Sequence, residues 1–196
     1  MIGIPLGLLY ANAVEWVVHK HVLHGLGKDR KSFWAFHWHE HHGNVRKNDH
    51  IDPTYERPLL GGWHAQSKEA LALALATAAH LPLAPVAPFF TATLVYSAVD
   101  YYRKHKRSHQ DPTWAREHLP WHVDHHLGPN QDANWCVTHP WMDVLMGTRE
   151  PYVGTEREAR DQARRAERAE RRAARAGPPE ASAAPPTAAP AVAVAA

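Results

Sequence analysis

The chain has 196 residues, of which seventeen are histidine and one is cysteine, and its formal net charge is +2. This small net charge, without basic residues that alternate with stacking aromatics, argues against a nucleic-acid-binding protein. The single cysteine, Cys136, excludes an internal disulfide and a thiolate-rich zinc or iron–sulfur site, which leaves nitrogen and oxygen as metal ligands.

The chain opens on an apolar stretch, Met1–Val18, whose only charge is Glu15. This stretch lacks the basic start of a secretory signal and runs directly into His19, so we interpret it as a membrane helix rather than a cleaved leader. The prediction is an all-α fold with integral membrane helices, of which this is the first.

A first histidine cluster, HKHVLH, follows that helix. His19 and His24 are five residues apart, which is too far round an ideal helix unless the turn is unwound. His21 and His24 are three apart and share a face. Histidine is the commonest metal-binding side chain, so we expect metal ligands in this cluster. Spacing alone favours the pair His21 and His24 as those ligands.

The second cluster, FHWHEHH, offers two competing registers. His37 and His41 are four residues apart, whereas His39 and His42 are three apart. We prefer His37, His41 and His42 as ligands, with His39 as the substitute. The segment that follows, Asn44–Ser67, contains prolines and a glycine pair and should be a loop over the membrane surface.

The second apolar stretch, Ala70–Val99, is uncharged over thirty residues, with prolines at positions 82, 85 and 88. A spanning helix needs about 20 apolar residues, so the pattern predicts a helical hairpin that crosses or penetrates the membrane. Basic residues follow both apolar stretches but not the hairpin turn, and this charge bias places the histidine clusters on the cytoplasmic face of a multi-pass membrane protein.

The third block fits helical geometry best. His105 and His109 are four residues apart, and His122, His125 and His126 form an HxxHH pattern that places three imidazoles on one stripe. The sequence therefore predicts a multinuclear metal site made of three separate histidine blocks.

Five more histidines and five carboxylates have weaker assignments. His50, His64 and His80 lie in no ligand pattern and are interpreted as ordinary core or surface residues, while His118 and His139 are better candidates for supporting ligands than for binding metal. Carboxylates often accept a hydrogen bond from the second ring nitrogen of a ligand histidine. The candidates for this role, from sequence proximity, are Glu15, Glu40, Asp100, Asp124 and Asp143.

Three segments differ in composition. Residues 1–153 form the expected catalytic domain. Residues 154–176 are rich in alanine, arginine and glutamate and predict a solvated charged helix. Residues 177–196 are alanine and proline with almost no charge, which predicts a disordered tail without a catalytic role.

The runs EWVVHKHVLH, HWHEHH, HKRSH and HVDHH, with an apolar hairpin between the second and third, resemble the fatty acid hydroxylase and sterol desaturase superfamily of membrane di-metal oxygenases. The resemblance covers about residues 12 to 150 and includes PWMDVLMGT, which is similar to the family's closing WDxxFGT. The family's usual second motif, HxxHH, is one residue longer here. Carried over residue by residue, the resemblance implies ten metal ligands: His19, His24, His37, His41, His42, His105, His109, His122, His125 and His126. The family generally has a hairpin before the first motif, so this chain either reduces it to one helix or begins late.

The resemblance implies an enzyme that binds two iron ions, with zinc as a possible replacement, and uses O2 to hydroxylate, or less often desaturate, a fatty acyl chain or sterol. The sequence HKHVLHG and the RKND loop lean towards a carotenoid ring hydroxylase instead. The sequence has no flavin, haem or iron–sulfur motif, so electrons would come from a separate protein of the cytochrome b5 or ferredoxin type. The alternative of another class is a non-redox zinc protein or hydrolase, whose site usually needs only three protein ligands.

Overall fold

The computed structural model describes residues 2–176, and all regular secondary structure in this range is helical. This confirms the predicted all-α class. In chain order the elements are α1 (Gly3–Val17), η1 (Val18–Leu26), η2 (Phe36–His41), α2 (His42–Lys47), η3 (Pro53–Glu56), α3 (Ala65–His80), η4 (Leu81–Leu83), α4 (Pro88–Gln110), α5 (Pro112–His118), α6 (Pro120–Leu127), α7 (Trp141–Leu145) and α8 (Glu156–Ala176). Elements η1 and η2 are π-helical, whereas η3 and η4 are 3₁₀ turns.

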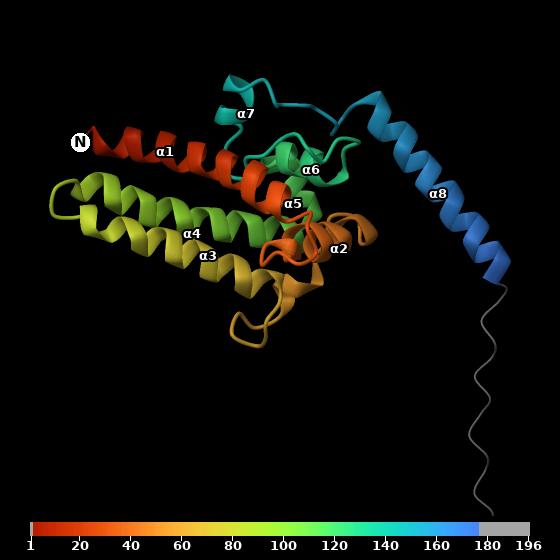
Figure 1. The fold of residues 1–196 in the computed structure, drawn as a ribbon. Helices are drawn as coiled ribbons and strands as arrows, with labels where there is room; N and C mark the ends of the chain where they lie inside the picture. Colours follow the sequence, from red (N-terminus) through yellow and green to blue (C-terminus); the bar gives the residue numbers. More distant parts are fainter. Residues whose placement is uncertain (1, 177–196) are drawn as a thin grey trace, which may run out of the picture. The chain divides into compact units, whose positions relative to one another are not determined.

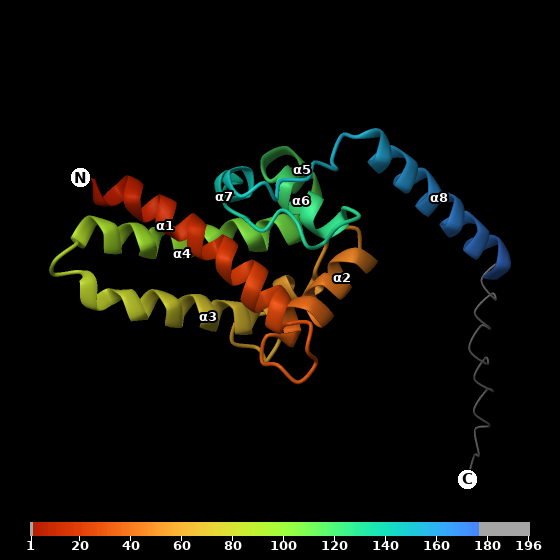
Figure 2. The same ribbon diagram turned by 45° about the horizontal axis from the view of Figure 1, so that its top comes forward.

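Three long helices form the frame of the molecule. Figure 1 shows α1, α4 and α3 running side by side, with the turn between α3 and α4 at the same end as the N-terminus. The short helices α2, α5 and α6 gather at the opposite end in both Figure 1 and Figure 2. Helix α1 approaches α4 closely through Gly7, where an added Cβ would lie 2.8 Å from the Cβ of Thr93. A glycine at this position therefore permits the close helix contact.

Prolines define where the helices begin. The predicted hairpin is present as α3 and α4, and the chain turns between them in a segment that contains Pro82 and Pro85. Helices α4, α5 and α6 each begin with a proline in the first turn, a position that needs no backbone N–H. Asp111 also caps α5 by accepting a hydrogen bond from the backbone N–H of Trp114 at 3.0 Å.

The predicted membrane integration is wrong. Within residues 2–176, no helix has both the length and the apolar character needed to cross a bilayer. Helix α1 has only 15 residues, and α3 has 16, against the roughly 20 that a spanning helix requires. Helix α4 has 23 residues, but charges from Asp100 to Arg107 occupy its second half. The multi-pass topology, and the cytoplasmic placement of the histidines that depended on it, are therefore not supported.

The C-terminal boundary lies slightly later than the predicted end of the domain at residue 153. The compact unit ends at Glu158, because the carboxylate of Glu158 forms an ion pair with the Arg116 guanidinium and accepts a 2.7 Å hydrogen bond from the Gly154 backbone N–H. The expected charged segment is helical and forms α8. The first residues of α8 belong to the compact unit, and its remainder from residue 159 belongs to a separate unit. The predicted tail, residues 177–196, lies outside the described residues.

Candidate metal centre

The π-helical segment η1 explains the spacing of five in the first cluster. A π-helix forms hydrogen bonds between residues five apart, so such residues lie one turn apart on the same face. The ring centroids of His19 and His24 accordingly lie 5.0 Å apart, and both side chains are buried. His21, which an ideal α-helix would favour, instead forms a T-shaped pair with Trp16, in which the ring centroids lie 6.0 Å apart. The pair implied by the family resemblance is therefore the pair that the backbone brings together.

The second cluster is accommodated in the same way. The π-helix η2 places His37 and His42, which are also five residues apart, with their Nε2 atoms 3.2 Å from each other. His41 points to the other side and meets different histidines. His39 turns away, and its Nε2 donates a hydrogen bond to the Lys28 carbonyl at 3.0 Å. The preferred register, rather than the substitute with His39, is the one that faces the centre.

All ten histidines of the predicted ligand set are buried and lie in adjoining groups. The first group is His19, His24, His37, His42 and His125. The second group is His41, His105, His109 and His126. A third group, His50, His109 and His122, shares His109 with the second. The rings of His42 and His126 lie 4.4 Å apart, so the first and second groups are immediate neighbours.

The nitrogens of the first group converge too closely to be explained by hydrogen bonds. The Nε2 atom of His42 lies 3.1 Å from that of His24 and 3.2 Å from that of His125. The other ring nitrogens of His24 and His125 face acceptors, the Asp132 carboxylate and the Ala133 carbonyl, so they carry the ring hydrogens. Lone pairs of His24 and His125 therefore point at a nitrogen that has one hydrogen at most. A shared cation removes this conflict, since two nitrogens about 2.1 Å from one ion and at right angles lie about 3.0 Å apart.

The second group repeats this arrangement. The Nδ1 atoms of His105 and His109 face Glu69 and the His50 carbonyl, respectively, yet their Nε2 atoms lie only 3.2 Å apart. His122 joins through its Nε2, which is 3.0 Å from that of His109. The Nε2 atoms of His41 and His126 are buried without any hydrogen-bond partner. Orphaned nitrogens of this kind are expected where a metal ion is the missing partner. The residues present therefore fit a metal centre.

Acceptors around the centre fix six of the ten rings. Ligand histidines usually donate their second ring N–H to a carboxylate or carbonyl, which sets the tautomer and orientation. Six histidines donate from Nδ1 in this way. Three donate to backbone carbonyls: His19 to Trp135, His109 to His50 and His125 to Ala133. Three donate to carboxylates: His24 to Asp132, His41 to Asp52 and His105 to Glu69. The hydroxyl of Tyr55 also donates to Glu69 at 2.6 Å. In each of the six rings the Nε2 atom is left free to bind metal.

None of the five carboxylates chosen by sequence proximity is among these acceptors. Glu40 accepts from the Ala65 backbone N–H, Asp100 pairs with Lys104, and Asp124 pairs with Arg149. Asp143 accepts from the backbone N–H groups of Trp135 and Cys136, and Glu15 accepts from those of Val137 and Thr138. Asp143 thereby holds the loop whose Trp135 carbonyl receives His19. Two of the actual carboxylate acceptors, Asp52 and Glu69, were missed because no helical spacing links them to the histidines that they hold.

Burial keeps the imidazoles neutral. It is the largest cause of a lowered pKa in nine of the ten histidines, and charge on neighbouring histidines adds to it. The pKa of His125, for example, falls to about 4, although its hydrogen bond to Ala133 opposes the shift. Neutral imidazole is the form that binds a metal ion, so the lowered pKa values of these nine histidines favour metal binding at neutral pH.

The remaining histidines lie outside the first two groups. His118 is stacked on Trp114, and His139 is stacked on Trp141 with ring centroids 4.5 Å apart. His64 is the N-cap residue that precedes α3, and the ring of His80 forms a 3.0 Å hydrogen bond with the hydroxyl of Tyr10. His50 is different, because the structure buries it against His109 and His122. No spacing pattern in the sequence pointed to it, since its position depends on a tight turn rather than on a helix.

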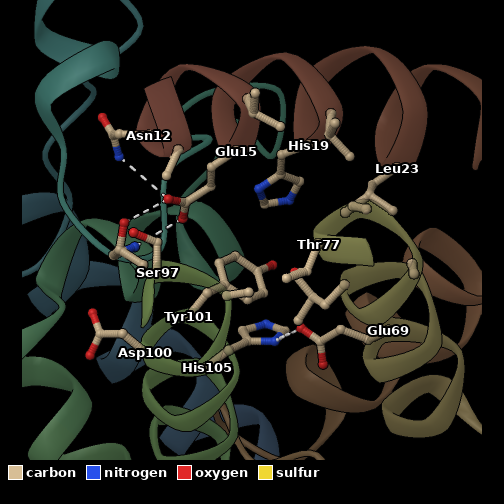
Figure 3. Close-up of a pocket in the computed structure, with 18 of the residues that line it drawn as sticks. Asn12, Glu15, His19, Leu23, Glu69, Thr77, Ser97, Asp100, Tyr101 and His105 are labelled. Carbon is tan, nitrogen blue, oxygen red and sulfur yellow. Dashed lines mark hydrogen bonds and ion pairs between the residues drawn. The ribbon is translucent and has the colours of Figure 1, made fainter. Parts of the chain in front are cut away.

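An apolar cavity of about 460 Å³ opens beside the centre. Its walls come from α1, α3 and α4 and include Leu8, Leu73, Leu94 and Ala98. Four ligand candidates, His19, His37, His41 and His105, line its inner end. Figure 3 shows His19 and His105 entering the cavity from different helices, together with Tyr101 and Leu23. This volume lies in the range of small-molecule sites, so an apolar ligand can reach the edge of both histidine groups.

Comparison with models of protein families, with curated proteins and with solved structures finds no match for this chain.

Proposed function

We propose that this protein is an oxygen-activating enzyme that binds two iron ions and hydroxylates an unactivated C–H bond of an apolar molecule held in the cavity. The observation that carries the proposal is the convergence of two histidine groups at the inner end of an apolar cavity. Neutral imidazoles as ligands suit iron, and a cavity with apolar walls suits a substrate that has no ionisable group to bind.

The number of histidines favours this reading over a hydrolytic zinc site. A catalytic zinc ion usually has three protein ligands, an open position and a nearby carboxylate base. The first group alone supplies five histidines, and the second group supplies four. A pair of redox-active ions that activate O2 together is a better match to so many nitrogen donors.

The chain's own residues then bind and orient the substrate. Leu73, Leu94 and Ala98 contact its apolar body and exclude water from the inner end of the cavity. Tyr55 and Glu69 hold the ring of His105, and Asp52 holds that of His41, so that two imidazoles keep their direction at the cavity's edge. Positioning of this kind brings one carbon of the substrate close to the metal ions.

The bound iron would supply reduction of O2 to a species able to take hydrogen from carbon. In the overall reaction, one oxygen atom enters the C–H bond to give an alcohol, and the other becomes water. Two electrons and two protons are required, and a separate reductant protein of the cytochrome b5 or ferredoxin type would supply the electrons. Fatty acyl, sterol and carotenoid molecules are the substrate classes to test, on the strength of the sequence motifs.

The first test is the metal content of the full chain purified after expression with added Fe²⁺. We expect about two iron ions per chain, and about one in a His126→Ala variant, because both ring nitrogens of His126 are buried without a protein partner. His118→Ala is the matched control on a neighbouring helix, because this histidine is half exposed and stacked on Trp114. Wild-type protein without bound metal would exclude the proposal.

The second test identifies the reaction. Lipid and pigment extracts of cells that express the wild-type chain are compared by mass spectrometry with extracts of cells that express the His125→Ala, His126→Ala double variant. A compound about 16 Da heavier, found only with the wild-type chain, would support hydroxylation and name the substrate, whereas a loss of two hydrogens would indicate desaturation. Two bound ions with no change in any extract would instead favour a non-redox metal protein.

A further inference from the structure

His50 occupies a strained turn just after α2. Asp49 and His50 have backbone φ angles of +49° and +78°, in the left-handed region that residues other than glycine rarely adopt. Such a backbone conformation is unfavourable and persists only where surrounding contacts enforce it. The turn brings the His50 side chain inwards, where only 1% of it is exposed.

Both ring nitrogens of His50 are buried without a hydrogen-bond partner. Among the described residues, the only other histidine with this property is His126, a member of the second group. Histidines away from the centre differ, since His64, His80 and His118 each use a ring nitrogen in a hydrogen bond. Two polar atoms that are buried and unpaired destabilise the fold unless a partner such as a metal ion satisfies one of them.

The position of the ring relative to the second group points to that partner. The centroid of the His50 ring lies 4.7 Å from the ring centroid of His109, 5.6 Å from that of His122 and 5.5 Å from that of His126. One ring nitrogen from each of His50, His109 and His122 lies within 4.8 Å of the others. The backbone of His50 belongs to the same assembly, because its carbonyl accepts the hydrogen of His109 Nδ1 at 2.9 Å.

His50 lies outside the wall of the cavity. The histidines that line the cavity are His19, His37, His41 and His105 near the centre, with His80 and His139 farther along, and His50 is not among them. A nitrogen donated by a residue outside the cavity wall takes up none of the space in which a substrate would bind. Such a ligand can add to the hold on an ion without competing with O2 or substrate.

We propose that His50 is an eleventh histidine ligand, which would bind the ion held by the second group without entering the cavity. This inference rests on the proposed two-metal centre. It explains in one step the strained turn, the two unpaired nitrogens and the place of His50 beside His109 and His122. The ion of the second group then has six histidines available, and that of the first group has five.

A cysteine at position 50 tests the contact directly. We would bind Co²⁺ to the full-length His50→Cys variant and record the near-ultraviolet absorption, where a thiolate that binds cobalt adds a charge-transfer band. His64→Cys is the matched control, because His64 is also buried but bonds to Pro58. The native Cys136 is common to both variants. We expect the band only with His50→Cys, and its absence from folded, cobalt-loaded protein would overturn the proposal.

If cysteine at this turn prevents folding, the affinity of a second variant, His50→Asn, for Co²⁺ tests the same proposal. Asparagine tolerates a positive φ better than other residues with a side chain, so His50→Asn should keep the turn and lose only the imidazole. Titration with Co²⁺ should show one of two sites weakened by about tenfold or more. Unchanged affinity at both sites would refute the role of His50 alone. Failure of the wild-type chain to bind any cobalt would refute the two-metal centre itself.

Discussion

At the scale of residues, the acceptors behind the histidines make the two groups electrostatically different. Rings of the first group donate to two backbone carbonyls and to Asp132, whose side chain is about half exposed. Rings of the second group donate to Asp52, which is fully buried, and to Glu69, which is nearly so. Buried carboxylates make an imidazole a stronger donor and offset the charge of a bound ion. We therefore expect the second group to bind its ion more tightly.

Asp52→Asn tests this difference. Asp52 accepts hydrogen bonds from His41 Nδ1 at 2.8 Å, from the Thr54 backbone N–H at 3.0 Å and from the Asn44 amide at 3.1 Å. Asparagine can still cap the following turn but has one oxygen fewer for these donors. Metal titration should show one site weakened by about 10- to 100-fold. Asp111→Asn, which changes a cap without a histidine partner, should leave both sites unchanged, and equal behaviour of the two variants would contradict the prediction.

At the scale of elements, two π-helical segments determine which histidines meet. Helical periodicity was sufficient for His105 and His109 on α4 and for the HxxHH pattern on α6, because those helices are regular. It was insufficient for His19 and His24, since a spacing of five shares a face only where the backbone widens to a π-turn. The family resemblance supplied that pair, and the extra residue in HxxxHH is accommodated in the same way by η2.

Other features could not be read from local pattern. The prolines located the hairpin turn. The run Ala70–Val99 was interpreted as membrane helices because it has no charge, but its thirty residues are shared between α3, the turn and the first half of α4. Each of those helices is too short, or too charged at one end, to cross a bilayer. The roles of Asp52, Glu69 and His50 depend on tertiary contacts, so no helical spacing rule could have found them.

Helix α1 is joined to the loop that follows α6 through Glu15. Its buried carboxylate accepts hydrogen bonds from two backbone N–H groups and the hydroxyl of Thr138, but burial still raises the pKa to about 7. Because the pKa is higher in the folded than in the unfolded chain, the contribution of Glu15 to stability is present at low pH and is lost as pH rises from about 4.5 to 7.

Glu15→Gln should remove this dependence on pH. The difference in free energy of unfolding between the wild type and the variant should shift by roughly 3 kcal/mol against the wild type between pH 4.5 and pH 8. Titration of the histidines cancels in this difference, because both proteins contain the same set. Chemical denaturation at several pH values measures it, and a difference that stays constant with pH would show that folding does not raise the pKa of Glu15.

The contact between α1 and α4 requires a small residue at Gly7. A Cβ at this position would lie 2.8 Å from the Thr93 Cβ and 2.9 Å from its methyl carbon, so the helices must separate to admit it. Gly7→Ala should therefore destabilise the fold by about 1–3 kcal/mol despite alanine's better helix propensity. Gly43→Ala in α2 is the matched control, because nothing lies within 4 Å of its added Cβ, and it should be neutral or stabilising. Thermal unfolding of both variants decides the matter.

At the scale of the whole molecule, the metal centre and the cavity share the same scaffold. Helix α1 continues into η1, which supplies His19, and α4 supplies His105, while both helices also form cavity walls. The histidines come from segments that are far apart along the chain, from residue 19 to residue 126. Neither the centre nor the cavity can therefore form until the three long helices have packed, which links metal binding to the stability of the fold.

Filling the cavity should separate substrate binding from metal binding. Ala98 lines the cavity from α4, so the indole of an Ala98→Trp variant can enter the space proposed for the substrate. Ala92→Trp on the same helix is the matched control, because Ala92 is exposed and does not line the cavity. We expect both variants to keep the metal content of the wild type, while product formation in Ala98→Trp falls by about 100-fold because substrate no longer reaches a productive position. Loss of metal in Ala98→Trp would mean that the centre itself is disturbed. Full activity with full metal content would place the substrate somewhere other than this cavity.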